Sequence, residues 1–166
     1  MKKRLFHEEQ RFRQLWVIII LVGINCLSAF SIIQQLIFKK PFGNNPMSDS
    51  GFIILECFMI LFTIWFLKVN LIISVYTDGI YYKFSMFWLK TRIVKKEEIK
   101  TFSIRKYDAI KENGGWGIKG SKKSKAYTIS GNKGIQLKLI NGIRILFGTQ
   151  KPNSFYKALD SIMNNN

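Results

Sequence analysis

The chain has 166 residues, and its 26 lysine and arginine side chains against 10 acidic ones give a formal net charge of +16. This length allows one ordinary domain, or a smaller domain together with membrane spans. With one histidine and two cysteines, both inside apolar runs, the composition argues against a disulfide scaffold, a zinc site and thiol chemistry. We therefore expect no metal, no cofactor and no enzymatic activity.

Residues 1–14 form a basic, amphipathic lead-in that is followed by a long apolar run. The run at 15–38 carries no formal charge and corresponds to about 36 Å of helix, enough to cross a hydrocarbon core of roughly 30 Å. Residues 17–22 are apolar on every side, so a helix here has no face suited to water. We reject a cleaved signal peptide, because the apolar region is too long and no small-x-small cleavage site follows it.

A second apolar run, at 51–67, follows a loop rich in proline, glycine and asparagine. The alternative to a second span is a buried core helix, but the first span lies one short loop away and favours a transmembrane hairpin over 15–68. Basic residues are concentrated before the first span and after the second, and the loop has only Lys39 and Lys40. This asymmetry predicts a multi-pass protein of the cell (cytoplasmic) membrane with both termini in the cytoplasm.

Two polar side chains inside the spans are candidates for function. Glu56 is an intramembrane carboxylate, which is by default a functional hypothesis, although it lies near the loop and can snorkel to the interface. Asn25, on the first span, can hydrogen-bond to the second span or to another copy of the chain. Both residues support an alternative function, that of an oligomeric channel or transport-accessory protein.

From residue 69 onward the pattern changes to short β-type runs separated by turn residues. Asp78-Gly79 joins two such runs, and Asn141-Gly142 joins two runs in which apolar and polar residues alternate. Further strands are predicted over 87–94, 99–107, 116–120 and 125–130. The last segment, 152–164, has helical spacing, with one apolar stripe formed by Phe155, Ala158, Leu159, Ile162 and Met163.

About seven antiparallel strands followed by one C-terminal helix is the pleckstrin-homology-like (PH-like) arrangement. The whole chain resembles small bacterial membrane proteins that have two N-terminal spans and a cytoplasmic PH-like domain. The segments that carry the resemblance are FHEEQRFRQLW, PFG, TDGIYYKF, GGWGIKG, AYTISGNKGIQL and FGTQKP. The resemblance implies a membrane α plus β architecture with a PH-like domain over 69–166, and it implies this architecture more strongly than any activity.

The stretch Gly115-Trp116-Gly117-Ile118-Lys119-Gly120 matches G-x-G-x-x-G, the fingerprint of a dinucleotide site. Such a site needs a helix directly after the glycines and a carboxylate about 20 residues further on, and the sequence here provides neither. A P-loop is excluded as well, since no Gly-Lys-Ser/Thr follows a glycine at the right spacing. The glycines instead predict a bulge or a strongly bent strand with Trp116 packed against it.

Lys119, Lys122, Lys123 and Lys125 surround the same stretch, in a domain with 18 basic and six acidic residues from Val69 onward. One interpretation is a solvated surface, and another is attraction to the anionic cytoplasmic leaflet at about 1 kcal/mol per basic residue. Nucleic-acid binding is a third, which membrane tethering disfavours, so we expect none. We predict a membrane-anchored binding or scaffold module whose four lysines contact anionic lipids, with a protein partner or self-association that the sequence does not identify.

Overall fold

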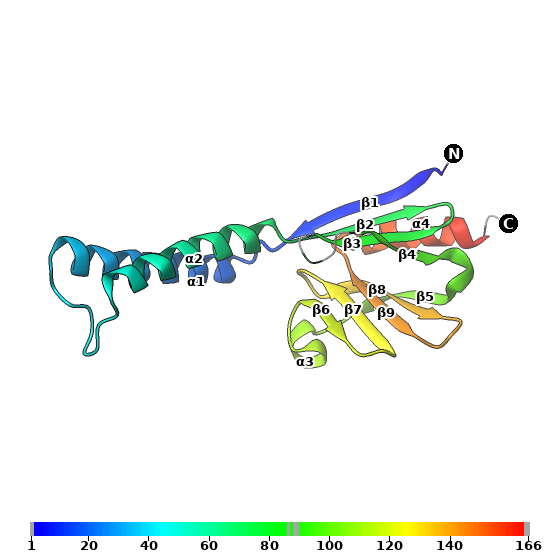
Figure 1. The fold of residues 1–166 in the computed structure, drawn as a ribbon. Coiled ribbons are helices and arrows are strands. Elements are labelled where there is room, and N and C mark those ends of the chain that lie inside the picture. Colours follow the sequence, from blue (N-terminus) through cyan, green and yellow to red (C-terminus); the bar gives the residue numbers. More distant parts are fainter. Residues whose placement is uncertain (1, 86, 88–89, 165–166) are drawn as a thin grey trace. The chain divides into compact units, whose positions relative to one another are not determined.

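The chain forms two compact units, one helical and one built from β-sheets (Figure 1). The computed structural model describes residues 2–85, 87 and 90–164. The helical unit is Arg13–Lys68, and the β-unit combines Met1–Phe12 with Val69–Asn166. In the sequence, the helical unit is therefore an insertion within the β-unit.

Two long apolar helices make up the helical unit. Helix α1 (Leu15–Ile32) continues into the π-helical turn η1 (Ile33–Ile37), and α2 (Asp49–Lys68) follows the loop. The two helical segments, of 23 and 20 residues, are long and apolar enough to cross a membrane. Only 11% and 6% of their apolar windows are buried by protein, whereas a core helix of a water-soluble domain is mostly covered. Both predicted spans are thus present as candidate membrane helices.

Aromatic and amide side chains close the loop end of the helical unit. Phe42 of the loop packs edge-to-face on Phe30 of α1 and on Phe52 of α2, with ring centroids 6.2 and 6.4 Å away. Gln35 donates a hydrogen bond of 2.7 Å to Asp49 Oδ1 at the start of α2. These contacts hold the loop against both helix ends, in agreement with the compact turn that its composition indicates.

The first sheet of the β-unit has four antiparallel strands in the order β1-β2-β3-β4. The strands are β1 (Arg4–Arg11), β2 (Asn70–Tyr76), β3 (Gly79–Phe84) and β4 (Arg92–Lys95). The strand predicted over 87–94 includes residues 88 and 89, which lie outside the described residues, and the structure places β4 at its end. A 3-10 turn, η2 (Lys96–Glu98), leads on to the second sheet.

The predicted hairpin of β2 and β3 is confirmed, with a shift of one residue at its turn. Tyr76 pairs with Gly79, so the two-residue loop is Thr77-Asp78 and not Asp78-Gly79. Gly79 instead begins β3 at φ +149°, and a Cβ there would lie 2.3 Å from the backbone oxygen of Val94 on β4. The glycine is needed for this close approach of two strands.

Strand β1 comes from the segment interpreted in the sequence as an amphipathic lead-in. It pairs with β2 along its length, and Glu8 lies opposite Ile73. Burial alternates along the strand, with Phe6, Glu8 and Gln10 buried and the residues between them exposed. The β-unit therefore includes residues on both sides of the helices, in addition to the expected 69–166.

The second sheet has five strands in the order β5-β8-β9-β7-β6, with β7 and β9 parallel and the other neighbours antiparallel. In total the described residues form nine strands, where about seven antiparallel ones were expected. One additional strand is β1. The parallel pair arises because β8 pairs with β5 on one side, and β9, which follows β8 in the chain, then lies between β8 and β7. The strands are β5 (Ile99–Lys106), β6 (Gly117–Gly120), β7 (Ser124–Thr128), β8 (Lys133–Leu139) and β9 (Arg144–Gly148).

The hydrophobic core lies between the two sheets and is closed by helix α4 (Pro152–Asn164), which contacts strands of both sheets. Tyr82 of β3 meets Phe147 of β9 with ring centroids 4.8 Å apart. Phe155 of α4 stacks on Phe6 of β1 at 4.9 Å. The predicted helix is confirmed, and four residues of its apolar stripe, Phe155, Ala158, Leu159 and Ile162, are buried, whereas the fifth, Met163, is half-buried. The fold is thus α plus β: two long apolar helices, two sheets and a C-terminal helix.

Candidate anion-binding face

One face of the five-stranded sheet is polar and basic, because residues far apart in sequence fall into register there. Lys138 of β8 pairs with Arg144 of β9 on one side and with Thr101 of β5 on the other. Arg144 pairs in turn with Ser124 of β7. Paired residues on neighbouring strands project from the same face of a sheet. The four side chains therefore form one row across four strands, in the order hydroxyl, cation, cation, hydroxyl, which we call the cationic row.

A cavity of about 420 Å³ contains the cationic row in its lining. Arg105 on β5 lies in the same lining, donates a hydrogen bond of 3.1 Å to Gln136 Oε1 and pairs with the carboxylate of Glu112. None of the ion pairs among the described residues includes Lys138 or Arg144, so these ion pairs compensate neither charge. The complete lining is Thr101, Ser103, Arg105, Ser124, Gln136, Leu137, Lys138 and Arg144.

A short helix, α3 (Ala109–Asn113), follows β5. Asp108 caps it, accepting hydrogen bonds of 3.0 Å from the backbone N–H groups of Ile110 and Lys111. Gly114 ends the helix in the left-handed conformation at φ +67°. This helix was not predicted from the sequence, because five residues are too few to show helical periodicity.

Trp116 and Tyr107 cover another part of the same sheet face. They pack with Ala109 against Ala126 of β7 and Leu146 of β9 in a small hydrophobic cluster. The Trp116 indole N–H donates a hydrogen bond of 3.2 Å to the backbone oxygen of Gly131. Burial raises the pKa of the Tyr107 phenol to about 12, so this group stays neutral at physiological pH. The cationic row lies outside this hydrophobic cluster.

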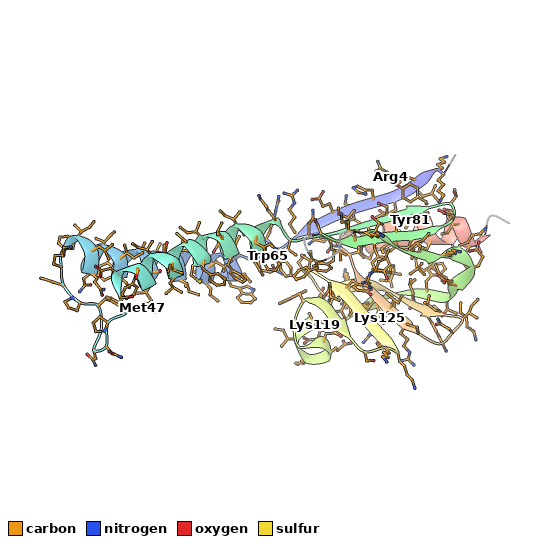
Figure 2. All side chains as sticks on the ribbon, viewed as in Figure 1. Arg4, Met47, Trp65, Tyr81, Lys119 and Lys125 are labelled. Atoms are coloured by element: carbon orange, nitrogen blue, oxygen red, sulfur yellow. The ribbon has the colours of Figure 1, made fainter. Side chains whose placement is uncertain are left out.

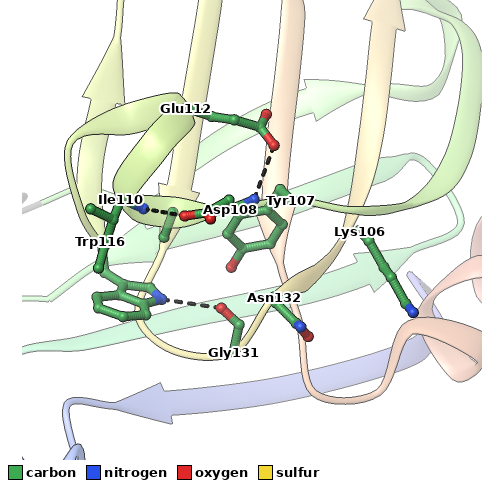
Figure 3. A pocket seen from close by; sticks show the side chains of 9 residues that line it. Lys106, Tyr107, Asp108, Ile110, Glu112, Trp116, Gly131 and Asn132 are labelled. Atoms are coloured by element: carbon green, nitrogen blue, oxygen red, sulfur yellow. Dashed lines mark hydrogen bonds between the residues drawn. The ribbon is translucent and has the colours of Figure 1, made fainter.

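A second cavity, of about 510 Å³, lies beside α3 (Figure 3). Its two carboxylates already serve the local fold: Asp108 caps α3, and Glu112 accepts the Asp108 backbone N–H at 2.9 Å while pairing with Arg105. The cavity is thus lined partly by aromatic side chains, and both of its carboxylates already make hydrogen bonds or ion pairs within the protein. Its lining is Lys106, Tyr107, Asp108, Ala109, Ile110, Glu112, Trp116, Gly131 and Asn132.

The G-x-G-x-x-G stretch leads into a β-hairpin. Gly117 begins β6, and Gly120, at φ +104°, ends it opposite Lys125 of β7. A Cβ on Gly120 would lie 2.1 Å from the backbone oxygen of Ser124, so the glycine permits the close approach of the two strands. The element after these glycines is a strand, whereas a dinucleotide site needs a helix there.

The four predicted lysines occupy different positions in the β6–β7 hairpin, in which Figure 2 labels Lys119 and Lys125. Lys119 lies opposite Ala126, on the face of the cationic row, whereas Lys125 is one position along β7 and projects from the other face. Lys122 and Lys123 lie in the loop between β6 and β7. The backbone oxygen of Lys123 accepts the Arg144 N–H at 2.9 Å, which places this loop at the end of the row.

Arg105, Lys138 and Arg144 were not predicted as site residues. Lys138 occupies a polar position in the alternating run that precedes Asn141, and this alternation does place it on the outer face. The missing information was the register, because β5, β7, β8 and β9 meet only in the folded sheet.

Polar groups inside the helical unit form a separate set. Asn25 donates from Nδ2 to Thr63 Oγ1 of α2 at 3.0 Å and to the backbone oxygen of Leu21 at 2.7 Å. Glu56 is half-buried on α2. Among the described residues, no hydrogen-bond partner reaches Glu56 Oε2 or Ser28 Oγ, and both atoms are shielded from solvent. The hydrogen bond between Asn25 and Thr63 therefore links the two helices, whereas the Glu56 carboxylate is incompletely satisfied by the described residues.

Buried polar groups attach β1 to the junction of β9 and α4. Glu8 Oε1 accepts the backbone N–H of Gln150 at 2.9 Å, and Glu8 Oε2 accepts the hydroxyl of Thr149. Gln10 Nε2 donates to the backbone oxygen of Gly148 at 2.7 Å. Buried carboxylates are costly unless hydrogen-bonded in this way. The first strand of the chain is thus fastened to its last strand by polar contacts that sequence patterns do not reveal.

The N-terminal end of β1 is attached to the β2–β3 turn by charge. Lys2 Nζ lies 2.6 Å from Asp78 Oδ2 and donates to the Tyr81 hydroxyl at 2.6 Å. The hydrogen bond from Lys2 lowers the pKa of the Asp78 carboxyl and raises that of the Lys2 ammonium. His7, further along the strand, lies 2.8 Å through Nδ1 from Ser74 Oγ of β2. The histidine is thus part of the sheet.

No protein-family model matches the chain, and no curated protein does. Within the described residues, no group of three or more histidine, cysteine, aspartate or glutamate side chains is placed to hold a metal ion. What the fold defines is therefore a class by architecture: a chain with two candidate membrane helices inserted into a two-sheet β-unit with a basic face.

Proposed function

We propose that this chain is a two-span protein of the cell membrane, and that its β-unit is a cytoplasmic, PH-like, non-enzymatic binding module held at the anionic leaflet. Three features support the proposal: the uncovered apolar helices, the pairing of strands on either side of them, and the basic character of the β-unit. The mechanism is display, in which the spans keep the basic face close to lipid and to partners at the membrane.

The observation that carries the proposal is the pairing of β1 with β2. These strands are neighbours in one sheet, yet residues 13–68, with both apolar helices, lie between them in the sequence. A sheet can form only if both strands are on the same side of the membrane. Two crossings return the chain to its starting side, whereas a single crossing would separate β1 from β2.

Charge selects the cytoplasmic side for the β-unit. Met1–Phe12 and Val69–Asn166 together contain 22 basic and eight acidic residues, a formal net charge of +14. The loop between the helices has only two lysines among residues 39–48. Basic segments next to spans are retained in the cytoplasm, where the anionic leaflet also attracts them.

The PH-like assignment is supported by the two sheets, which enclose one hydrophobic core, and by the C-terminal helix α4, which covers the open side of that core. Strand β1 and the parallel β7–β9 pair are departures from the expected arrangement. A non-enzymatic role is proposed because Asp108 and Glu112, the acids of the larger cavity, are engaged in capping and ion pairing. The proposal includes binding to a protein partner or to a second copy of the chain, and it assigns no surface to that contact.

Cysteine labelling on intact cells tests the topology. With Cys26 and Cys57 replaced by alanine, single cysteines are introduced as Lys3→Cys, Asn44→Cys and Lys151→Cys. A membrane-impermeant maleimide should label position 44 in intact cells, and positions 3 and 151 only after permeabilisation. Labelling of positions 3 and 151 from opposite sides of the membrane would refute the proposal.

A second candidate function is an oligomeric channel or transport accessory. It is favoured by Glu56 Oε2, which is shielded from solvent and has no hydrogen-bond partner among the residues that the structure describes. Ion flux into liposomes containing the full chain, compared with the Glu56→Gln variant, separates the two functions. The binding-module proposal expects no flux that depends on Glu56. A flux that Glu56→Gln abolishes would favour the channel.

A further inference from the structure

We infer that the cationic row binds a phosphomonoester, either the headgroup of a membrane lipid or a soluble molecule. The inference rests on the proposed function of the β-unit as a binding module and names the ligand class of its basic face. It is carried by the pairing of Lys138 with Arg144, by the hydroxyl groups on either side of them, and by the size of the cavity.

Lys138 and Arg144 face each other at the position where two strands bring side chains closest. The Leu139 N–H donates to the Ile143 backbone oxygen at 2.8 Å, so residues 139 and 143 form a hydrogen-bonded pair. The neighbouring Lys138–Arg144 pair is then a non-hydrogen-bonded pair, in which Cα atoms are about 4.5 Å apart. Like charges directly opposite each other destabilise a sheet. A bound anion between the two cations converts this repulsion into attraction.

The two cations suit a dianion better than a monoanion. A phosphomonoester carries a charge of about −1.5 to −2 at neutral pH and offers three strong acceptor oxygens. The Arg144 guanidinium can donate two parallel hydrogen bonds to such a group, and the Lys138 ammonium adds a compact charge from β8. A phosphodiester, with one charge and two free oxygens, would satisfy only part of the pair.

The rest of the row accommodates what is attached to the phosphoryl group. Ser124 and Thr101 lie one strand beyond each cation, about 4.8 Å away, so their hydroxyls can reach polar substituents. The cavity of about 420 Å³ exceeds the needs of a lone phosphate ion. Its lining contains no aromatic side chain, although single-stranded nucleic acid typically stacks its bases on aromatic platforms. A small polar phosphomonoester therefore fits better than a nucleic-acid strand.

The test uses the full chain in phosphatidylcholine nanodiscs, with glycerol 3-phosphate as the probe and glycerophosphocholine as the phosphodiester comparison at equal ionic strength. The site variant is Lys138→Gln/Arg144→Gln. The matched control is Lys106→Gln/Lys133→Gln. This variant also removes two cations that pair directly across neighbouring strands, Lys106 of β5 and Lys133 of β8, but they lie on the other face of the sheet. The unfolding temperature without ligand verifies that each variant folds, and the site variant should unfold at the same temperature or higher.

We expect glycerol 3-phosphate to bind the unmodified chain more tightly than the phosphodiester, and the site variant to lose about tenfold or more in affinity. The control should retain its affinity. Equal binding of both probes, or equal losses in both variants, would overturn the inference while leaving the membrane topology from cysteine labelling untouched.

Native mass spectrometry of the full chain with bound lipid distinguishes whether the phosphomonoester belongs to a lipid headgroup or to a soluble molecule. Retention of phosphatidic acid over phosphatidylglycerol, abolished in the site variant, would identify a lipid headgroup. Tight binding of glycerol 3-phosphate without preference for phosphatidic acid would identify a soluble phosphomonoester. Both results support the inferred ligand class.

Discussion

Glu8, on the strand that precedes both apolar helices, accepts a hydrogen bond of 2.9 Å from the backbone N–H of Gln150, 142 residues later. Its second carboxylate oxygen accepts the hydroxyl of Thr149, and only 6% of the residue is exposed. The contact joins the two ends of the chain and closes the core of the β-unit. Because hydrogen bonds to a buried charge contribute more than neutral ones, this contact is a specific point of weakness.

Replacement of Glu8 by alanine should therefore destabilise the β-unit. The Thr149 hydroxyl and the Gln150 N–H would remain buried without an acceptor, at a cost of about 1–3 kcal/mol in the free energy of unfolding. Urea unfolding of the detergent-solubilised chain measures the change. Glu9→Ala is the control, because Glu9 lies on the outer face of the same strand and its partners Arg11 and Asn70 are at the surface. Equal losses for both variants would contradict this role for Glu8.

The contact between Lys2 and Asp78 should make the attachment of β1 sensitive to acid. The pKa of Asp78 is lowered in the folded chain, so the contact adds stability above the unfolded value of about 3.9 and loses it as the pH falls through the lower, folded-state pKa. Lys2→Met should lower the unfolding temperature slightly at pH 7, and this difference should shrink as the pH falls below about 3.9. Lys3→Met is the control. A difference that does not shrink in acid would point to the hydrogen bond between Lys2 and the Tyr81 hydroxyl as its cause, and not to the Asp78 carboxylate.

Gly120→Ala should destabilise the β6–β7 hairpin more than Gly142→Ala destabilises the β8–β9 turn. Both glycines have a positive φ, of +104° and +81°, which costs alanine about 1 kcal/mol or more. At Gly120 the new Cβ would also lie 2.1 Å from the Ser124 oxygen, whereas nothing lies within 4 Å at Gly142. Comparing the unfolding free energies of the two variants isolates the clash. Equal values would show that the hairpin adjusts freely.

The hydrogen bond between Asn25 and Thr63 should stabilise the two helices only modestly. Interhelical side-chain hydrogen bonds in membranes average about 0.6 kcal/mol, because the separated helices find other partners. A double-mutant cycle with Asn25→Ala and Thr63→Val, followed by unfolding in detergent, measures the coupling between the two residues. A coupling near zero would show that Asn25 acts through its bond to the Leu21 backbone alone.

Much of the local structure was predictable from sequence because it depends on neighbours. The two apolar helices follow from continuous hydrophobicity, the β8–β9 hairpin from period-two alternation around Asn141-Gly142, and α4 from its apolar stripe. Each pattern is complete within about 20 residues. No distant partner is needed to recognise it.

Strand β1 and the cationic row were not predictable because each depends on partners far along the chain. The inward positions of β1 include Glu8 and Gln10, so polarity along this strand suggests the wrong face. Arg144 and Ser124 become neighbours only because β9 enters the sheet parallel to β7. The predicted lysines lie close together in sequence, but alternation directs Lys119 and Lys125 to opposite faces of the sheet.

The insertion of the helices between β1 and β2 also fixes an order of events during synthesis. Residues 4–11 leave the ribosome first, but their partner strand at 70–76 emerges only after both apolar helices have been made. Until then β1 lacks its partner strand in the sheet. Under the proposed topology, completion of the β-unit requires that both helices have crossed the bilayer, and a chain stalled after one crossing would be left with an open core that proteases can recognise.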